Sequence, residues 1–577
     1  MIRKHAAPVI RAAAAALFVA GCSPPPANEM AGAYDIVISR GKIVDGTGSA
    51  WFYGDVAVRG DRIARITSAG LLDSAAATKR IDARGLVVIP GIIDIQGQSI
   101  LPFTVGDGRA LSKVTQGVTT EILGEGSTPA PANEQIKTAA SIIPKQPLAA
   151  VIDSFAGEHG FNAWLETMQR HGISVNVGSF LGAETIRVYA KGAAQGTPSA
   201  AELDTMRAIT RNAMRDGAFG VASALIYPPG RYAGTEELIE VAKAMSPLGG
   251  LYITHMRSEA DAYLEAIDEA MRIGKEGGVP VEIFHLKAGG VRNWPKGSQA
   301  IAKIDSARAA GQDVSADMYP YVAGGTGLAA CAPPWSAEGN KLLDNIKDAA
   351  TKAKMVAEMR SDRTTWENLC GLATPNGVMI VGLTTPELKK YEGKRLAEVA
   401  KAEGKDWATT ALDIVLAENA GVGMIVFMMN EDNVRLQMRQ PWMKFGTDAD
   451  AWDPDSTNGA LTHPRAYGTY PRILGFYVRE QKVIPLEDAV RKMTSAVANR
   501  LGMRERGALR QGAYADIAIF DEHAIIDKAT FAEPHQLSVG VKHVIVNGTQ
   551  VLDDGRHTGA KPGRVVRGPG WTGWTQQ

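Results

Sequence analysis

The chain has 577 residues, of which 45% are hydrophobic and 21% are charged. This balance predicts a globular protein with a large core and excludes intrinsic disorder. Basic and acidic residues number 62 each, so the formal net charge is zero and the broad positive field of a nucleic-acid-binding protein is excluded. Only three cysteines occur, so we expect no disulfide scaffold, and we expect Cys331 and Cys370 to be free or packed thiols.

The first 22 residues are typical of a bacterial lipoprotein signal peptide. Basic residues precede a short apolar run at 12–20, and small residues lead to Cys22. The run is too short to span a bilayer, which needs about 20 apolar residues. We therefore expect a lipid anchor on Cys22, a flexible tether at 23–33, and a periplasmic protein held to the membrane of the bacterial cell envelope by that lipid alone. The alternative is an ordinary secretory signal with a chance cysteine.

The rest of the chain reads as an α/β protein. Short β-branched runs separated by Gly and Asp lie near both ends, which predicts one small β-sandwich domain built from residues 34–89 and 501–577. Between them, apolar strand-like runs alternate with helical stretches, which favours a (β/α)8 TIM-like barrel over residues 90–500. Because a typical barrel needs only about 250 residues, we expect an insertion near 330–405, where Lys/Glu-rich helical sequence interrupts the strand rhythm. Ordinary barrel helices with long loops would also explain that stretch.

Four side chains that can bind a metal follow predicted barrel strands. His255 and His285 each end an apolar run, 30 residues apart, so one β/α unit would place both imidazoles on the same rim. Asp448 and Glu125 also end short runs. Each residue alone is more often a packing or capping residue, but together they predict a metal site at the carboxyl ends of the strands.

The sequence resembles the amidohydrolase superfamily, and more closely the N-acyl-D-amino-acid deacylases, or D-aminoacylases. The resemblance covers essentially all of the chain after the signal. The segments that carry it are Asp35–Gly48, Ile89–Asp94, Gly217–Gly220, Leu225–Tyr232, Thr254–Arg257, Asp317–Tyr321, His463–Arg472 and Gly512–Asp521.

The resemblance implies a metal-dependent barrel enzyme that hydrolyses the amide of N-acylated D-amino acids. His255 and His285 match the family's zinc-binding histidines, and Asp448 matches its general acid/base. Lys287, Tyr319 and Arg465 match the group that holds the substrate carboxylate. A cationic Lys and a forked Arg suit that task.

Two departures from the family pattern concern the metal. Where most amidohydrolases have His-x-His after the first barrel strand, this chain has Gln96 and Gln98, which are poor zinc ligands, so we expect one ion rather than two. Where the family has a cysteine, this chain has Glu125 one residue out of register. A Glu/His/His set is a known type of catalytic zinc site. Glu121, in the same predicted strand, is a competing ligand.

The sequence thus predicts an amide hydrolase with one zinc ion on Glu125, His255 and His285. The ion would polarise the acyl carbonyl and activate water, and Asp448 would carry the proton to the leaving nitrogen. Two alternatives are hydrolysis of another amide, such as a D-aminoacyl dipeptide or cell-wall fragment, and an envelope protein that binds such ligands without turnover. The acyl group, the amino-acid side chain and the oligomeric state do not follow from the sequence.

Overall fold

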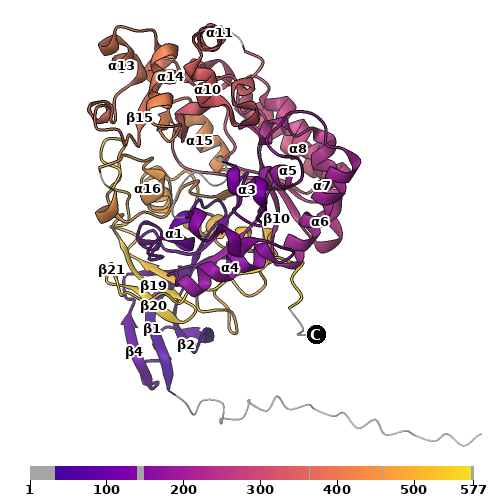
Figure 1. The fold of residues 1–577 in the computed structure, drawn as a ribbon. Coiled ribbons are helices and arrows are strands. Elements are labelled where there is room, and N and C mark those ends of the chain that lie inside the picture. Colours follow the sequence, from indigo (N-terminus) through magenta and orange to yellow (C-terminus); the bar gives the residue numbers. More distant parts are fainter. Residues whose placement is uncertain (1–32, 140–147, 363, 458, 574–577) are drawn as a thin grey trace, which may run out of the picture.

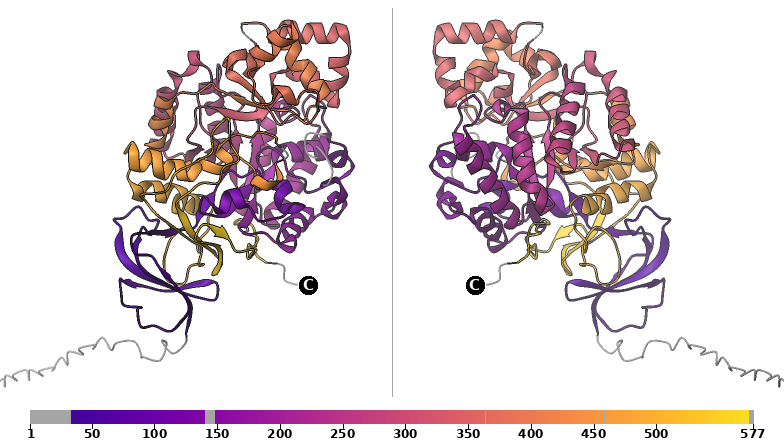
Figure 2. Two further views of the ribbon diagram at one scale, coloured as in Figure 1. Left: turned by 90° about the vertical axis from the view of Figure 1, so that its left-hand side faces the viewer. Right: turned by 90° about the vertical axis from the view of Figure 1, so that its right-hand side faces the viewer.

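The computed structural model describes residues 33–139, 148–362, 364–457 and 459–573. The predicted signal, Cys22 and all but the last residue of the predicted tether lie outside these residues. Figure 1 shows a barrel at the centre of the molecule, a β-domain at one end and a mostly helical region at the other, and the two views of Figure 2 show the same order.

The barrel is formed by parallel strands that follow one another around the ring. They are β6 (Ile92–Asp94), β7 (Val118–Leu123), β8 (Asn176–Ser179) with β9 (Leu181–Gly182), β10 (Gly220–Ala224), β11 (Leu251–His255), β12 (Val281–Ile283), β13 (Val314–Met318) and β17 (Met443–Phe445). β8 and β9 are two halves of one strand position separated by Phe180, whose amide donates to the carbonyl of Leu123. The ring closes between β17 and β6, where a parallel bridge joins Gly97 to Ala449. The predicted TIM-like barrel is confirmed.

Helices that follow the barrel strands cover the outside of the ring. They are α4 (Gly160–His171), α5 (Ala183–Lys191), α6 (Ala200–Arg215), α7 (Thr235–Met245), α8 (Tyr263–Gly277), α9 (Lys296–Ala309), α15 (Glu431–Met438), α16 (Arg465–Arg472), α17 (Leu486–Met493) and α18 (Ser495–Arg500). Their apolar faces pack on the strands, as in α8, where Ile267, Ala270 and Ile273 are buried. Within the described part of the chain, no helix is both long and apolar enough to cross a membrane.

The β-domain is built from both ends of the chain, as predicted. Its sheet contains β1 (Tyr34–Ile43), β2 (Phe52–Arg59), β3 (Arg62–Ser68), β4 (Ala77–Asp82), β5 (Val87–Pro90), β18 (Ile517–Phe520), β19 (Val541–Val546), β20 (Thr549–Asp553) and β21 (Arg556–His557). β1 pairs with β4 in its first half and with β5 in its second. The change of partner coincides with an irregularity between Ile38 and Gly41, where Arg40 has a φ of 60°. Bulges of this kind bend a strand, and the bend lets strands from both chain ends enclose one core.

The insertion lies between β13 and β17 and has its own core. Its antiparallel sheet has the order β14 (Gly324–Gly327), β16 (Gly423–Val426), β15 (Val378–Val381). The accompanying helices are α10 (Leu342–Lys347), α11 (Ala349–Met359), α12 (Leu369–Ala373), α13 (Leu396–Glu403) and α14 (Trp407–Ala417). The region is therefore wider than the expected 330–405, because β14 and β16 pair across it.

The insertion also corrects one prediction. Cys331 and Cys370 form a disulfide, so the expectation of free or packed thiols is wrong. Both residues lie in the buried core of the insertion, which brings together two positions 39 residues apart. Their spacing matches no short motif, which is why the sequence did not reveal the pairing.

Candidate metal centre and substrate pocket

The predicted site residues lie together at the carboxyl ends of the barrel strands. His255 is the last residue of β11, and Glu125, His285, Tyr319 and Asp448 follow β7, β12, β13 and β17. All of them, with Lys287 and Arg465, line one cavity of about 710 Å³. A barrel places active-site groups on this rim because each strand end can present a side chain to the same opening.

Glu125, His255 and His285 form a compact cluster of possible metal ligands. Glu125 Oε1 lies 3.1 Å from His255 Nδ1 and 3.1 Å from His285 Nε2. One ligand atom from each residue falls within 4.8 Å of the other two. Burial opposes ionisation of Glu125, but the two histidines hold its pKa well below the usual value. One carboxylate and two imidazoles in this arrangement fit a divalent ion such as zinc.

The other oxygen of Glu125 is held by the two glutamines that replace the usual histidines. Gln96 Nε2 and Gln98 Nε2 lie 2.6 and 2.7 Å from Glu125 Oε2. A carboxylate accepts hydrogen bonds, so both side-chain amides donate to it. These two bonds leave Oε1 directed at the histidines.

Asp448 lies beside the metal cluster, and side-chain and backbone contacts hold it in place. Gln98 Nε2 lies 3.2 Å from its Oδ1, and Arg465 Nη1 lies 2.7 Å from its Oδ2. Its backbone is left-handed, with a φ of 49°, and its amide donates to the carbonyl of Gln96. A left-handed non-glycine residue costs energy that the surrounding structure must supply, and such residues are common at active sites. Burial raises the pKa of Asp448, against the opposing charge of Arg465.

Arg465 and Tyr319 present unpaired donors to the cavity. Both residues are buried, and the guanidinium of Arg465 stacks 4.7 Å from the centre of the Tyr319 ring. Arg465 Nε and the Tyr319 hydroxyl have no hydrogen-bond partner among the described residues, whereas Arg465 Nη1 is ion-paired with Asp448. Buried donors are normally satisfied, so these two call for a ligand that accepts hydrogen bonds. A carboxylate fits the fork of an arginine.

Lys287 is oriented differently from the other predicted carboxylate-binding residues. Its Nζ lies 2.6 Å from Glu259 Oε1, 2.7 Å from His285 Nδ1 and 3.1 Å from the His285 carbonyl oxygen. The ammonium can only donate, and its acceptors are the Glu259 carboxylate and the His285 carbonyl oxygen. Sequence reasoning missed Glu259. Its signal is the spacing His255-x-x-x-Glu259 directly after a barrel strand.

Comparison with known proteins connects this geometry to a family. An amidohydrolase family model matches residues 395–552. The D-aminoacylase of Alcaligenes xylosoxydans xylosoxydans is 34% identical over 536 residues, which cover 92% of this chain and 97% of that protein. The N-acyl-D-glutamate deacylase of the same organism is 33% identical over 92% of this chain and 96% of its own length. This chain belongs to the N-acyl-D-amino-acid deacylases of the amidohydrolase family. The recognition made from the sequence is confirmed.

Solved structures agree with this assignment. An N-acyl-D-glutamate deacylase from Bordetella bronchiseptica, complexed with zinc and a phosphonate mimic of the tetrahedral intermediate, superposes with a TM-score of 0.75 at 31% identity, covering 93% of this chain and all of that one. A D-aminoacylase described as having a binuclear metal centre, with one-metal activation and second-metal attenuation, gives a TM-score of 0.74 at 32% identity, covering 92% and 100%. This member of the family is a metal-dependent amide hydrolase.

Glu121, the competing ligand in this deacylase, lies in a different layer. Its side chain is fully buried below the rim, where Oε1 accepts hydrogen bonds from the amide and hydroxyl of Ser99 at 3.2 and 2.5 Å. Lys113 Nζ lies 3.5 Å from the same oxygen. Glu121 is not among the three residues that form the possible metal cluster in the described chain.

Proposed function

We propose that this deacylase hydrolyses N-acyl-D-amino acids with one divalent ion, most simply zinc, bound by Glu125, His255 and His285. The observation that carries the proposal is the pairing of this ligand cluster with the unpaired donors of Arg465 and Tyr319 in one cavity. Such a cavity can hold the amide at one end and the carboxylate at the other.

The ion's contribution is that of zinc sites in general: when bound, it polarises the acyl carbonyl and lowers the pKa of water. The chain's own groups support a single ion. The Gln96 and Gln98 amides satisfy Glu125 Oε2 and are themselves poor ligands. Relatives with two metal ions show that the fold can hold a second one, so the glutamines would decide the number here.

Asp448 is the proton carrier in this proposal. It is buried beside the cluster, burial raises its pKa and so favours proton uptake, and Gln98 and the backbone bond to Gln96 hold it in place. A positioned acid/base of this kind contributes about 10² to 10⁴ in rate. Asp448→Asn should therefore lose two to four orders of magnitude in kcat while it binds metal like the wild type.

The α-carboxylate of the substrate would bind to Arg465 and Tyr319. Lys287, which is hydrogen-bonded to Glu259, would contribute its positive charge. Fixing this end of the substrate orients the amide toward the ligand cluster. Arg465→Lys keeps the positive charge but loses the paired N–H donors with which a guanidinium binds a carboxylate. KM should therefore rise far more than kcat falls.

The rest of the cavity favours an apolar amino-acid side chain. The insertion lines it with Leu369, Val381, Met424, Ile425, Val426 and Met428. Of the described residues around the cavity, Lys287 and Arg465 are the only Lys or Arg, and both lie beside carboxylates of the protein. A second carboxylate on the substrate would find no further basic partner. We infer a preference for N-acyl derivatives of apolar D-amino acids over those of D-glutamate and D-aspartate.

Metal content and substrate series test these proposals together. Protein purified without chelator should hold one ion per chain by elemental analysis, and two tightly bound ions would refute the role of the glutamines. N-acetyl-D-leucine and N-acetyl-D-methionine should be hydrolysed with a higher kcat/KM than N-acetyl-D-glutamate, and the L-enantiomers should react poorly. Ligand binding without turnover in metal-loaded protein would instead favour a binding protein.

We also propose that the protein is a lipid-anchored, periplasmic component of the bacterial cell envelope. The lipoprotein-type segment ending at Cys22 motivates this location. The Cys331–Cys370 disulfide supports it, because disulfides persist in oxidising compartments. Cys22→Ala should leave the membrane fraction or fail to mature, and unchanged fractionation would refute the anchor.

A further inference from the structure

Glu259 lies directly behind the two histidines of the metal cluster. Its side chain is buried, with 1% of its surface exposed. Its Oε1 is 2.9 Å from His285 Nδ1, and its Oε2 is 3.5 Å from His255 Nε2. These are the ring nitrogens that do not face Glu125. One oxygen of the Glu259 carboxylate therefore lies near His285 and the other near His255, each on the side of the ring away from Glu125.

The tautomers that metal binding requires explain this arrangement. His255 turns Nδ1 toward Glu125, and His285 turns Nε2 toward it. A neutral imidazole that gives one nitrogen to a metal carries its proton on the other, and that N–H needs an acceptor. Glu259 supplies an oxygen to each. His255 Nε2 makes no hydrogen bond among the described residues, and Glu259 Oε2, at 3.5 Å, is the carboxylate oxygen that lies near it.

We propose that Glu259 is a positioning residue that fixes the tautomer and orientation of both metal-binding histidines at once. This inference rests on the metal site proposed above. The same carboxylate also holds the ammonium of Lys287 at 2.6 Å, so it sets the position of the cation on the substrate side as well. One buried group therefore connects the metal-binding and substrate-binding halves of the pocket.

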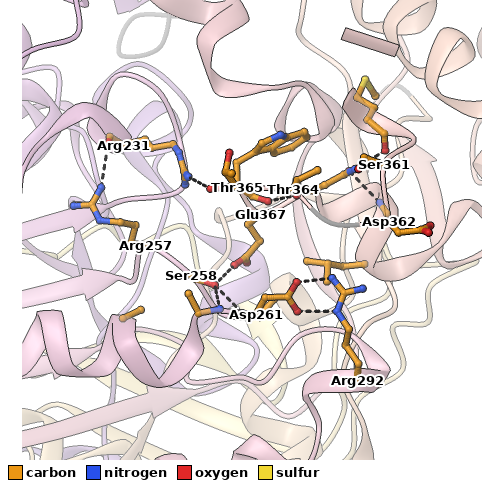
Figure 3. Close-up of a pocket in the computed structure, with 18 of the residues that line it drawn as sticks. Arg231, Arg257, Ser258, Asp261, Arg292, Ser361, Asp362, Thr364, Thr365 and Glu367 are labelled. Atoms are coloured by element: carbon orange, nitrogen blue, oxygen red, sulfur yellow. Dashed lines mark hydrogen bonds and ion pairs between the residues drawn. The ribbon is translucent and has the colours of Figure 1, made fainter. Parts of the chain in front are cut away.

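The insertion and the loop after β12 hold Glu259 in place. The amide of Glu259 and the hydroxyl of Ser258 lie 2.8 and 2.7 Å from Glu367 Oε2, and the Glu259 carbonyl accepts a hydrogen bond of 2.7 Å from Gly289. Figure 3 shows Glu367 in contact with Ser258 in the lining of a second cavity, of about 590 Å³. Ser258 lines that cavity and Glu259 lines the substrate pocket, so this two-residue segment forms part of the wall between them.

The test compares two buried Glu–Lys pairs. Glu259→Gln keeps the size of the side chain, but its NH2 group would face a ring N–H or the ammonium, so it can accept at one position only. The matched control is Glu282→Gln. Glu282 is fully buried, lies 3.0 Å from Lys444 and 2.9 Å from Arg500, and does not line the substrate pocket.

Zinc affinity is measured by competition with a chelator on apo-protein reloaded with metal. Glu259→Gln should bind zinc 10- to 100-fold more weakly than the wild type, the range usual for the partners of metal-binding histidines. Its cobalt-loaded form should also show an altered visible spectrum. Glu282→Gln should lose thermal stability but keep wild-type affinity and spectrum.

Glu259→Asp provides a second variant that retains the charge. It should recover part of the affinity, since one shorter carboxylate can still reach one ring. Equal zinc affinity and spectrum in the wild type, Glu259→Gln and Glu259→Asp would overturn the inference, as would an equal loss in Glu282→Gln. A wild type that binds no metal would overturn the proposed function instead, so the two failures are distinguishable.

Discussion

Two carboxylates four residues apart, Glu121 and Glu125, lie in layers of opposite character. Glu121 belongs to a fully buried ionic layer in which Lys113 is 2.8 Å from Asp94 and 3.5 Å from Glu121. Glu125 lies one layer higher, and its contacts are two imidazoles and two amides. The lower layer contains the ammonium of Lys113 as its cation, whereas the upper layer offers ligand atoms that can bind a metal ion. The difference explains why only one of these glutamates suits a metal.

The lower layer also supports the upper one. Lys113 Nζ contacts Asp94, the Thr447 hydroxyl and the Ala449 carbonyl at 2.6 to 2.8 Å, and Thr447 and Ala449 flank Asp448. The amide of Thr447 donates to Asp94. A structural ion cluster thus fixes the backbone of the proposed proton carrier.

The largest expected effect is that of removing the charge of Glu125. Glu125→Gln keeps the shape of the side chain but weakens a direct metal ligand, so zinc affinity and activity should fall together. Activity should fall by about 10³ or more, which corresponds to an increase of roughly 4 kcal/mol in the activation free energy. Excess metal should partly restore turnover, because the defect is occupancy. Chelator competition and kinetics at several zinc concentrations measure both effects. Full activity at wild-type metal content would remove the distinction between the layers.

Removing the internal cation should harm folding rather than metal binding. Lys113→Met leaves Asp94 and Glu121 without their ammonium partner, and breaking a buried ion pair on one side typically costs about 3–5 kcal/mol. Chemical denaturation should show this loss, while the folded fraction should still bind one zinc ion. A stable variant that has lost its metal would place Lys113 in the metal site instead.

The smallest effect is expected for Glu121→Gln. Burial raises the pKa of Glu121 to about 7, despite the opposing charge of Lys113. A carboxyl whose pKa is higher in the folded state stabilises the fold below its unfolded pKa, near 4.5, and loses that contribution as pH rises through 7. The free energy of unfolding of Glu121→Gln should therefore improve relative to the wild type between pH 4.5 and 7, by about 1–3 kcal/mol.

The same variant decides the ligand. Glu121→Gln should retain wild-type zinc content, measured beside Glu125→Gln. Loss of metal in Glu121→Gln but not in Glu125→Gln would exchange the roles of the two residues.

Much of the architecture was predictable because it depends on local patterns. The short strands at both chain ends and the apolar runs that end in His255 and His285 gave the β-domain, the barrel and two of the metal-binding residues. Strands β4 and β5 were not predicted as separate elements, because their positions depend on which half of β1 each one pairs with.

The contacts made by each side chain were less accessible. The sequence suggested that Lys287 faces the substrate, but its ammonium lies on Glu259, a residue 28 positions away that only the packing of β11 and β12 brings near. The disulfide was missed for the same reason, since it depends on the fold of the insertion. Long-range pairing of polar groups leaves no periodic signal in a single sequence.

The contact between Glu367 and the Ser258–Glu259 segment has a consequence for engineering. The insertion carries the apolar lining of the pocket, which makes it the obvious part to exchange between relatives in order to change selectivity. Glu367, three residues before Cys370, belongs to the insertion and would be exchanged with it. Its carboxylate binds the segment that carries Glu259. A grafted insertion without an equivalent carboxylate would alter metal retention along with substrate choice. The selectivity module and the catalytic scaffold are therefore separable only if this contact is kept.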